Sequence, residues 1–195
     1  LKALLGTAGA MLAVSAPLAD VRAAIASLGE RVVVANHNGP RQVVLSGSTD
    51  AIDEAEARLR QARLGAKRLA VATAFHSPIV AASAAPFAAF LEDVAIHAPA
   101  RAIYSNAEAA AYPAEAGAMR ACLAGRIARP VRCVEMIEAL YAAGVRTCVE
   151  VGPGAVLTGL VGECLSGRPH HAVNLDRKGQ HGVVGLWNGL GRLAV

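Results

Sequence analysis

Aromatic residues are scarce in this chain. Of its 195 residues only 4% are Phe, Trp or Tyr, although 54% are hydrophobic and the mean hydropathy is +0.40. The longest stretch without an acidic or basic side chain, 69–91, contains His76, two prolines and three hydroxyl groups, which a membrane-spanning helix would leave unpaired in hydrocarbon. We therefore expect a soluble protein without a membrane segment, long enough for one large domain.

Cysteine is infrequent, and its spacing excludes the usual metal and redox motifs. The four cysteines are Cys122, Cys133, Cys148 and Cys164. No C-x-x-C pair exists to bind zinc or to carry dithiol chemistry. The adjacent His170 and His171 lie near Cys164, but they lack a common facing geometry and a completing carboxylate, so we expect no metal site. Free thiols favour a reducing compartment, the cytoplasm.

Strong charge is also missing. Lys and Arg number 19 against 15 Asp and Glu, and the only adjacent basic pairs are Lys67-Arg68 and Arg177-Lys178. Such dispersed charge gives little support to nucleic-acid binding. It suits a solvated surface, and equally a coenzyme A phosphate or an acidic carrier protein.

Nucleotide-binding motifs are absent. Gly152-Pro153-Gly154 follows an apolar run and precedes a helical pattern, but the next glycine is Gly159. Neither G-x-G-x-x-G nor a P-loop with its lysine is formed, so a dinucleotide site is not expected.

The beginning of the chain imitates a secretory signal, because Lys2 is followed by an uncharged run, 3–19. That run continues directly into a regular helix and strand pattern, and the chain starts with Leu1 rather than Met. We therefore expect a piece of a longer protein rather than a signal peptide.

Hydrophobic periodicity predicts a compact unit over 11–74. Predicted strands are 11–15, 32–35, 42–46 and 69–74, with helices over 18–28 and from Ser48 or Thr49 to Gly65. The order strand, helix, strand, strand, helix, strand is that of a ferredoxin-like βαββαβ fold.

Helices alternate with short strands in the remainder. Predicted helices are 78–94, 114–128, 131–143, 155–165 and 182–195, and predicted strands are 102–105, 146–151 and 172–175. Consecutive strands joined by helices indicate a parallel α/β layer. Three strands are too few for a complete sheet, so we expect further strands from residues before Leu1. The apolar face of the last helix predicts core packing in preference to a docking face.

His76 is the strongest catalytic candidate. It comes just after a predicted strand, and Pro78 turns the chain away. There the imidazole could offer one nitrogen to a nucleophile and be held through the other, although a purely structural histidine fits the same pattern. Ser77 is a poor partner, because neighbouring residues of an extended segment point to opposite faces.

The polar segment 36–40 also has two interpretations. Asn36 and Asn38 could line a substrate pocket with their amides, and the same Asn, Gly and Pro residues are typical of a tight turn.

Four motifs together carry a resemblance to a known family. They are ANHNGPRQVVLSG at 35–47, AFHSP at 74–78, RPVR at 129–132 and VEVGPGAVL at 149–157. In this order, over about 9–175, they resemble the acyltransferase domains of type I (modular) polyketide synthases and the malonyl-CoA:acyl-carrier-protein transacylases. The segment 174–182 resembles the linker that follows such a domain in a multidomain synthase.

The resemblance implies an α/β fold with a ferredoxin-like small subdomain inserted in a hydrolase-like parallel α/β domain. On this basis 1–10 is the end of the upstream part of the large subdomain, 11–74 the small subdomain, 75–173 the C-terminal part of the large subdomain and 174–195 the linker.

The resemblance also implies the reaction. In the family, a G-H-S-x-G serine takes the acyl group from a coenzyme A thioester, and it then passes to the phosphopantetheine thiol of an acyl carrier protein. His76 corresponds to the general base, held by a main-chain carbonyl near 126–129, and Phe75, Asn36, Asn38 and Gln42 correspond to substrate-binding positions. Phe75 resembles malonyl-selective members. Malonyl-CoA, the carrier protein and neighbouring synthase domains are the implied partners, with no bound cofactor.

One departure is clear: the chain contains no G-H-S-x-G. We therefore expect it to be the C-terminal two thirds or so of an acyltransferase, inactive alone. The alternative is a noncatalytic ferredoxin-like binding module on a helical scaffold.

Overall fold

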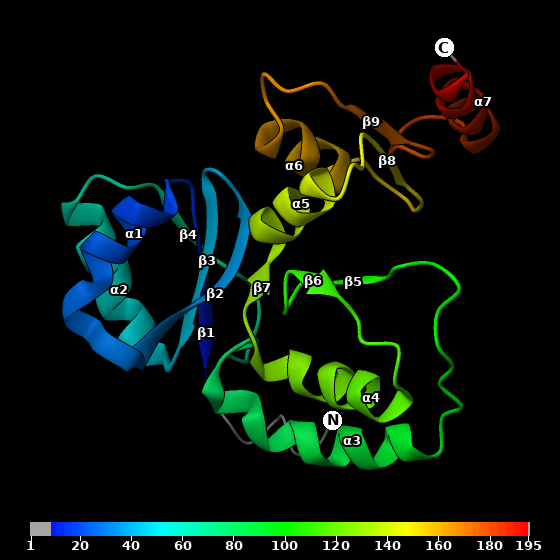
Figure 1. The fold of residues 1–195 in the computed structure, drawn as a ribbon. Coiled ribbons are helices and arrows are strands. Elements are labelled where there is room, and N and C mark those ends of the chain that lie inside the picture. The colour runs from blue at the N-terminus through cyan, green and yellow to red at the C-terminus, as the bar shows by residue number, and fades with distance from the viewer. Residues whose placement is uncertain (1–8, 195) are drawn as a thin grey trace. The chain divides into compact units, whose positions relative to one another are not determined.

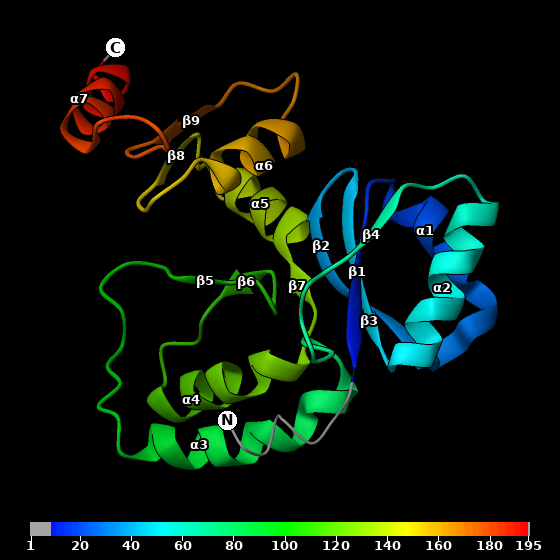
Figure 2. The ribbon, with the colours of Figure 1, turned by 180° about the vertical axis from the view of Figure 1, so that it is seen from behind.

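The computed structural model describes residues 9–194, which divide into two compact units (Figures 1 and 2). Residues up to Met136 belong to the first unit and residues from Ile137 to the second. Residues 1–8, which include the start of the uncharged run and most of the predicted segment 1–10, lie outside the described residues. The subdomain boundaries expected at 74 and 173 stay predictions.

A mixed five-stranded sheet dominates the first unit. Its strands are β1 (Ala10–Val14), β2 (Val32–Gly39), β3 (Gln42–Gly47), β4 (Ala66–Arg68) and β7 (Val131–Arg132). The spatial order is β4-β1-β3-β2-β7. The pairs β4–β1, β1–β3 and β3–β2 are antiparallel, and β7 is parallel to β2.

Two helices cover one face of this sheet, α1 (Leu18–Ile25) and α2 (Thr49–Gln61), with a 3-10 segment η1 (Ala26–Arg31) after α1 (Figure 1). Strand alternation turns Leu12 and Val14 to the helices, where they pack with Ile52 and Leu59 of α2 in one buried cluster. The Ser48 hydroxyl accepts from the Ala51 amide and caps α2. The predicted strand and helix order of this unit is confirmed.

Two local predictions in this unit are wrong. The last strand is β4 at Ala66–Arg68, and the predicted 69–74 lies outside it in an irregular segment. Residues 36–39 of the presumed turn 36–40 are instead part of β2, and the turn itself lies at Pro40 and Arg41. Register irregularities between Val34 and Asn36 and between His37 and Gly39 accommodate the extra residues, so the polar sequence is paired strand.

Short helices and a small hairpin follow. The elements are η2 (Pro78–Ser83), α3 (Ala84–Glu92), β5 (Tyr104–Ser105), β6 (Ala110–Ala111), α4 (Ala116–Gly125), η3 (Arg126–Ala128) and α5 (Cys133–Ala142). The strand predicted at 102–105 pairs with β6 in a hairpin, not with the parallel layer. The helix predicted from 131 begins instead as β7, whose two residues extend the first sheet.

The second unit has the expected parallel crossover. Strand β8 (Thr147–Glu150), helix α6 (Val156–Cys164) and strand β9 (His171–Asn174) form it, and β8 and β9 are parallel in the register Thr147↔His171. Helix α7 (Gly182–Leu193) packs on the end of β9 and Leu175 through Gly185 and Gly189: a Cβ atom at Gly189 would lie 2.7 Å from Leu175 Cδ2 and 3.2 Å from Asn174 O. Its large apolar side chains are exposed, Trp187 at 67%. The prediction that they are core residues is therefore wrong.

No helix within residues 9–194 has the length and apolar character needed to cross a bilayer.

Candidate active site

His76 occupies an unusual backbone conformation just before η2. Its φ is +58°, in the left-handed region that costs a non-glycine residue about 1–2 kcal/mol. The segment around η3 holds it there: the His76 amide donates to the Ile127 carbonyl over 3.1 Å, and Nδ1 lies 3.0 Å from the carbonyl oxygen of Arg129. Strain enforced by the surroundings in this way is characteristic of functional positions.

The contact with Arg129 determines which imidazole nitrogen is available. A carbonyl oxygen only accepts, so Nδ1 carries the hydrogen and the neutral ring keeps its lone pair on Nε2. The residue is partly exposed, so Nε2 can take a proton from a nucleophile brought to it. The main-chain carbonyl expected near 126–129 is thus Arg129 O.

Ser77 does not act with His76. Its side chain is 1% exposed, and its hydroxyl donates to the Ala74 carbonyl over 2.6 Å, closing the turn that contains His76. On the other side of His76, Phe75 is 36% exposed, which makes its ring accessible to a substrate.

The expected amide residues lie on the β2–β3 hairpin. Asn36 and Asn38 are half-buried residues of β2, and Gln42, the first residue of β3, is paired with Gly39. Asn36 pairs with Val131, two residues after the Arg129 carbonyl that holds His76. Because β2 and β7 are parallel, Asn38 and Gln42 lie further along the hairpin, away from Arg129. The structure therefore brings Asn36 closer to His76 than the other two.

His37 was not among the expected site residues, yet it is anchored beside them. Its Nδ1 lies 3.3 Å from Oε2 of Glu135 at the start of α5, and its side chain is 15% exposed. Glu135 also approaches Arg132 at 3.8 Å. The pair fixes the β2–β7 junction next to Asn36, and only the tertiary structure shows it, since the two residues are 98 positions apart.

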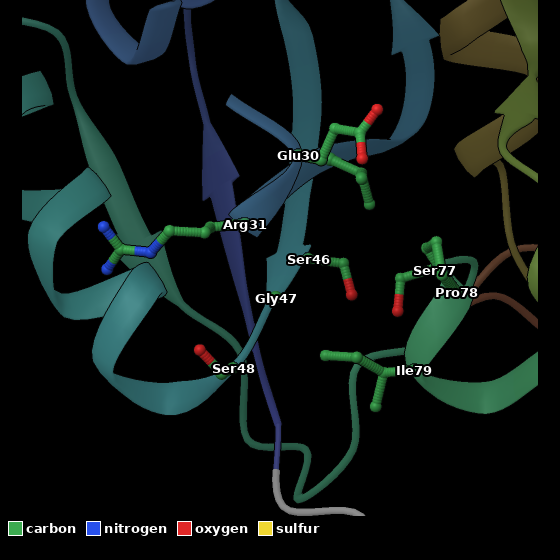
Figure 3. Close-up of a pocket in the computed structure, with 9 residues that line it drawn as sticks. Glu30, Arg31, Ser46, Gly47, Ser48, Ser77, Pro78 and Ile79 are labelled. Carbon is green, nitrogen blue, oxygen red and sulfur yellow. The ribbon is translucent and has the colours of Figure 1, made fainter. Parts of the chain in front are cut away.

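A small pocket lies between β3 and the start of η2 (Figure 3). Its volume is about 230 Å³. The hydroxyls of Ser46 and Ser77 face this space, while the Arg31 guanidinium points away from it (Figure 3). The pocket is lined by residues that directly follow His76 but not by His76 itself.

The Gly152-Pro153-Gly154 turn leads into the N-terminus of α6. The amide groups there already have a hydrogen-bond acceptor within the chain, the Glu150 carboxylate. Oε2 of Glu150 accepts from the Thr158 amide at 2.8 Å and the Thr158 hydroxyl at 2.7 Å, and Oε1 accepts from the Leu157 amide at 3.2 Å. Burial raises the pKa of the Glu150 carboxyl, but these hydrogen bonds together hold it below its ordinary value. A carboxylate thus occupies the place where a phosphate could bind.

Across residues 9–194, no group of three or more His, Cys, Asp and Glu side chains is arranged to hold a metal ion. The side chain of His170 contacts the nearby backbone instead: its Nδ1 lies 2.8 Å from the carbonyl oxygen of Arg168.

The sequence as a whole matches one family description, "Acyl transferase domain", over residues 1–187. The chain belongs to this acyltransferase family. Among its relatives, the polyketide synthase GfsA of Streptomyces halstedii is 35% identical over 83% of the chain and 2% of GfsA. The malonyl CoA-acyl carrier protein transacylase of Haemophilus influenzae is 36% identical over 68% of the chain and 42% of that enzyme.

Solved acyltransferase structures share the fold. The acyltransferase domain from the second module of the salinomycin polyketide synthase superposes with a TM-score of 0.83 at 32% identity, over 97% of this chain and 44% of that one. A malonyl-transacylase in complex with a type II polyketide synthase acyl-carrier protein gives a TM-score of 0.84 at 26% identity, over 97% and 62%. The chain thus spans less than two thirds of the length of these relatives.

Proposed function

We propose that this chain supplies the general base and part of the substrate pocket of an acyltransferase that moves a malonyl group from coenzyme A to an acyl carrier protein. The observation that carries the proposal is the geometry of His76, whose Nδ1 is held by Arg129 O and whose Nε2 is free to take a proton. Membership of the acyltransferase family supports the reaction class.

The reaction has two half-steps. In the first, a serine oxygen attacks the thioester carbonyl of malonyl-CoA while His76 Nε2 takes the hydroxyl proton; the C–S bond then breaks, and the coenzyme A thiolate receives that proton. In the second, the phosphopantetheine thiol attacks the seryl ester, and the proton returns through Nε2 to serine. A weak alcohol nucleophile needs such a base in both directions.

The serine of this proposal lies in a G-H-S-x-G segment that the 195 residues do not contain. Strands β1–β4 with α1 and α2 form a ferredoxin-like small subdomain in this proposal, supported by the order β4-β1-β3-β2. The β8–α6–β9 crossover then belongs to a hydrolase-like parallel domain, supported by the parallel register of β8 and β9.

Phe75, Asn36, Asn38 and Gln42 contact the acyl chain or the pantetheine arm in this proposal. The exposure of Phe75 and the position of Asn36 near Arg129 support the first two assignments most directly. Malonyl-CoA as donor and a carrier protein as acceptor are supported by relatives named as malonyl transacylases and by the solved complex with a carrier protein. Coenzyme A and phosphopantetheine act as substrates, without a bound cofactor.

Neighbouring synthase domains are further partners in the proposal, since several relatives are large polyketide synthases. A cytoplasmic location is supported by the thiols of Cys122, Cys133 and Cys148, which form no disulfide. The family match over 187 residues favours the enzyme over the alternative of a noncatalytic binding module.

The test is His76→Ala in a full-length acyltransferase domain that contains this chain. We expect self-acylation by malonyl-CoA, followed by stopped flow, to slow by about 100-fold or more, the usual size of a general-base contribution. His97→Ala, at an exposed histidine of the same unit, is the matched control and should leave the rate unchanged. A loss below about fivefold for His76→Ala would make His76 a structural residue.

A further inference from the structure

The turn between β5 and β6 is stabilised by hydrogen bonds between a buried side chain and the backbone. Ser105 is 2% exposed, and its Oγ accepts from the amides of Ala107 and Glu108 at 3.2 and 3.3 Å. Ala109 closes the turn with a φ of +53°. Side-chain-to-backbone hydrogen bonds of this kind fix the backbone of a turn. They also fix the position from which the Glu108 side chain extends.

This turn makes three contacts with residues 129–132, the segment that contains β7 and the residues just before it. The Glu108 carboxylate forms an ion pair with the Arg129 guanidinium. The Arg132 amide donates to the Asn106 carbonyl over 2.7 Å, and Arg132 Nη1 donates to the Glu108 carbonyl over 3.3 Å. The segment is therefore fixed by backbone and side-chain contacts alike.

The same segment holds the base. The Ile127 carbonyl accepts the His76 amide, and the Arg129 carbonyl accepts Nδ1–H of its ring. Arg129 thus presents its carbonyl to His76 and its guanidinium to Glu108. Any change that frees the Arg129 side chain loosens the acceptor that determines the tautomer of His76.

We propose that Glu108 is a positioning residue for this acyltransferase, acting through Arg129 to keep the proton of His76 on Nδ1 and the lone pair on Nε2. The proposal rests on the proposed role of His76 as general base. Glu108 touches neither substrate nor the reacting atoms in this scheme. Its contribution is moderate, because the carboxylate is 37% exposed and the guanidinium 52% exposed, and water screens such pairs.

The first measurement reads the tautomer directly in the 195-residue chain. Nitrogen-15 spectra of the histidine rings, recorded at a pH where His76 is neutral, report which ring nitrogen is protonated. We expect the ratio of Nδ1–H to Nε2–H tautomer to fall about two- to fivefold in Glu108→Gln, the range that the free energy of an exposed ion pair allows. Glu54→Gln is the matched control, since Glu54 is also 37% exposed and paired with arginines on α2 and η1. It should not alter the ratio.

The second measurement separates positioning from general damage. In a full-length acyltransferase domain containing this chain, Glu108→Gln should lower kcat for acylation by the same two- to fivefold and leave KM for malonyl-CoA unchanged, as expected of a pair of that size. Arg129→Gln should do the same, and the double variant should be no slower than either single variant, because both remove one interaction.

The outcomes distinguish the two proposals. If Glu108→Gln matches Glu54→Gln in both tautomer ratio and kcat while His76→Ala abolishes acylation, the positioning role is wrong and the general base stands. If His76→Ala acylates normally, the proposed function fails, whatever the tautomer ratio shows. Additive losses in the Glu108 and Arg129 double variant would overturn the route through Arg129.

Discussion

At the scale of single residues, Phe75 is the side chain that we propose selects the acyl group. It precedes His76 in the same strained turn, and it is 36% exposed. A phenyl ring beside the base would occupy the volume that an α-methyl branch needs, whereas a serine there would leave it open. Selection by one methyl group is worth about 1–3 kcal/mol where the group only fills a pocket, and more where it meets a rigid ring.

We therefore expect a full-length domain containing this chain to prefer malonyl-CoA to methylmalonyl-CoA, and Phe75→Ser to narrow that preference by raising the methylmalonyl rate. A competition assay with both thioesters in one tube, read as the ratio of acyl-enzyme masses, measures this. Phe90→Ser is the control, because Phe90 is 64% exposed on α3 and stacks on Phe87 instead. Equal loading of the two thioesters by the unmodified domain would contradict the expectation.

Sequence-based interpretation of single residues rested on local signals. His76 could be singled out because Pro78 and the preceding apolar run mark the end of an extended segment. The contact of His76 with Arg129 joins residues 53 positions apart, and that of His37 with Glu135 joins residues 98 apart. Sequence spacing alone cannot predict contacts between residues so far apart along the chain. Near Glu108, Ser105 and Asn106 are residue types that favour a turn, but they do not show which residue Glu108 pairs with.

At the scale of elements, the wrong predictions for 36–40 and 69–74 share one cause. Strand pairing in the tertiary structure decided the conformation of these segments against their local propensity. Residues 36–39 are turn-forming types, but β3 and β7 pair with this segment and make it strand. The apolar 69–74 has strand character, yet the edge of β1 is already taken by Ala66–Arg68. The long helices and the β8–α6–β9 crossover, with their strong periodicity, were predictable.

Helix α6 depends on a carboxylate from the preceding strand. Its own N-cap residue, Ala155, offers no side-chain acceptor, so Glu150 at the end of β8 satisfies the amides of Leu157 and Thr158. We expect Glu150→Gln to lower the free energy of unfolding of the chain by about 0.5–1 kcal/mol at pH 7, as for the loss of other helix caps. Urea denaturation measures it. Glu163→Gln, at an exposed carboxylate on the same helix, should change it little.

The effect of Glu150 should also depend on pH. Its carboxyl pKa is lowered from the ordinary value of 4.5, so its stabilisation is complete above that value and is lost as the pH falls through the lower pKa of the folded state. The difference between the wild-type chain and Glu150→Gln should therefore shrink as the pH falls below 4.5. A difference that stayed constant down to pH 3 would show that the ionised form of Glu150 is not what stabilises α6.

At the scale of the whole molecule, the proposed base His76 lies in an acyltransferase chain that contains no G-H-S-x-G segment. The two-stranded β8–β9 sheet is smaller than the five or six strands of an average sheet. Large apolar side chains beside it are exposed, among them Val151 at 81% and Val156 at 69%. The chain spans 44% of the solved salinomycin synthase domain.

The final prediction concerns the chain by itself. Incubated with malonyl-CoA, the 195-residue protein should gain no stable malonyl group, because it contains no G-H-S-x-G serine and an alcohol without a base in hydrogen-bond reach is a weak nucleophile. The hydroxyl of Ser77, the serine next to His76, already donates a hydrogen bond to the Ala74 carbonyl. Intact-protein mass spectrometry measures the outcome, with a complete malonyl CoA-acyl carrier protein transacylase as positive control. A malonyl adduct on any serine of the chain would show that it contains its own nucleophile, and peptide mapping of that adduct would identify which serine His76 serves.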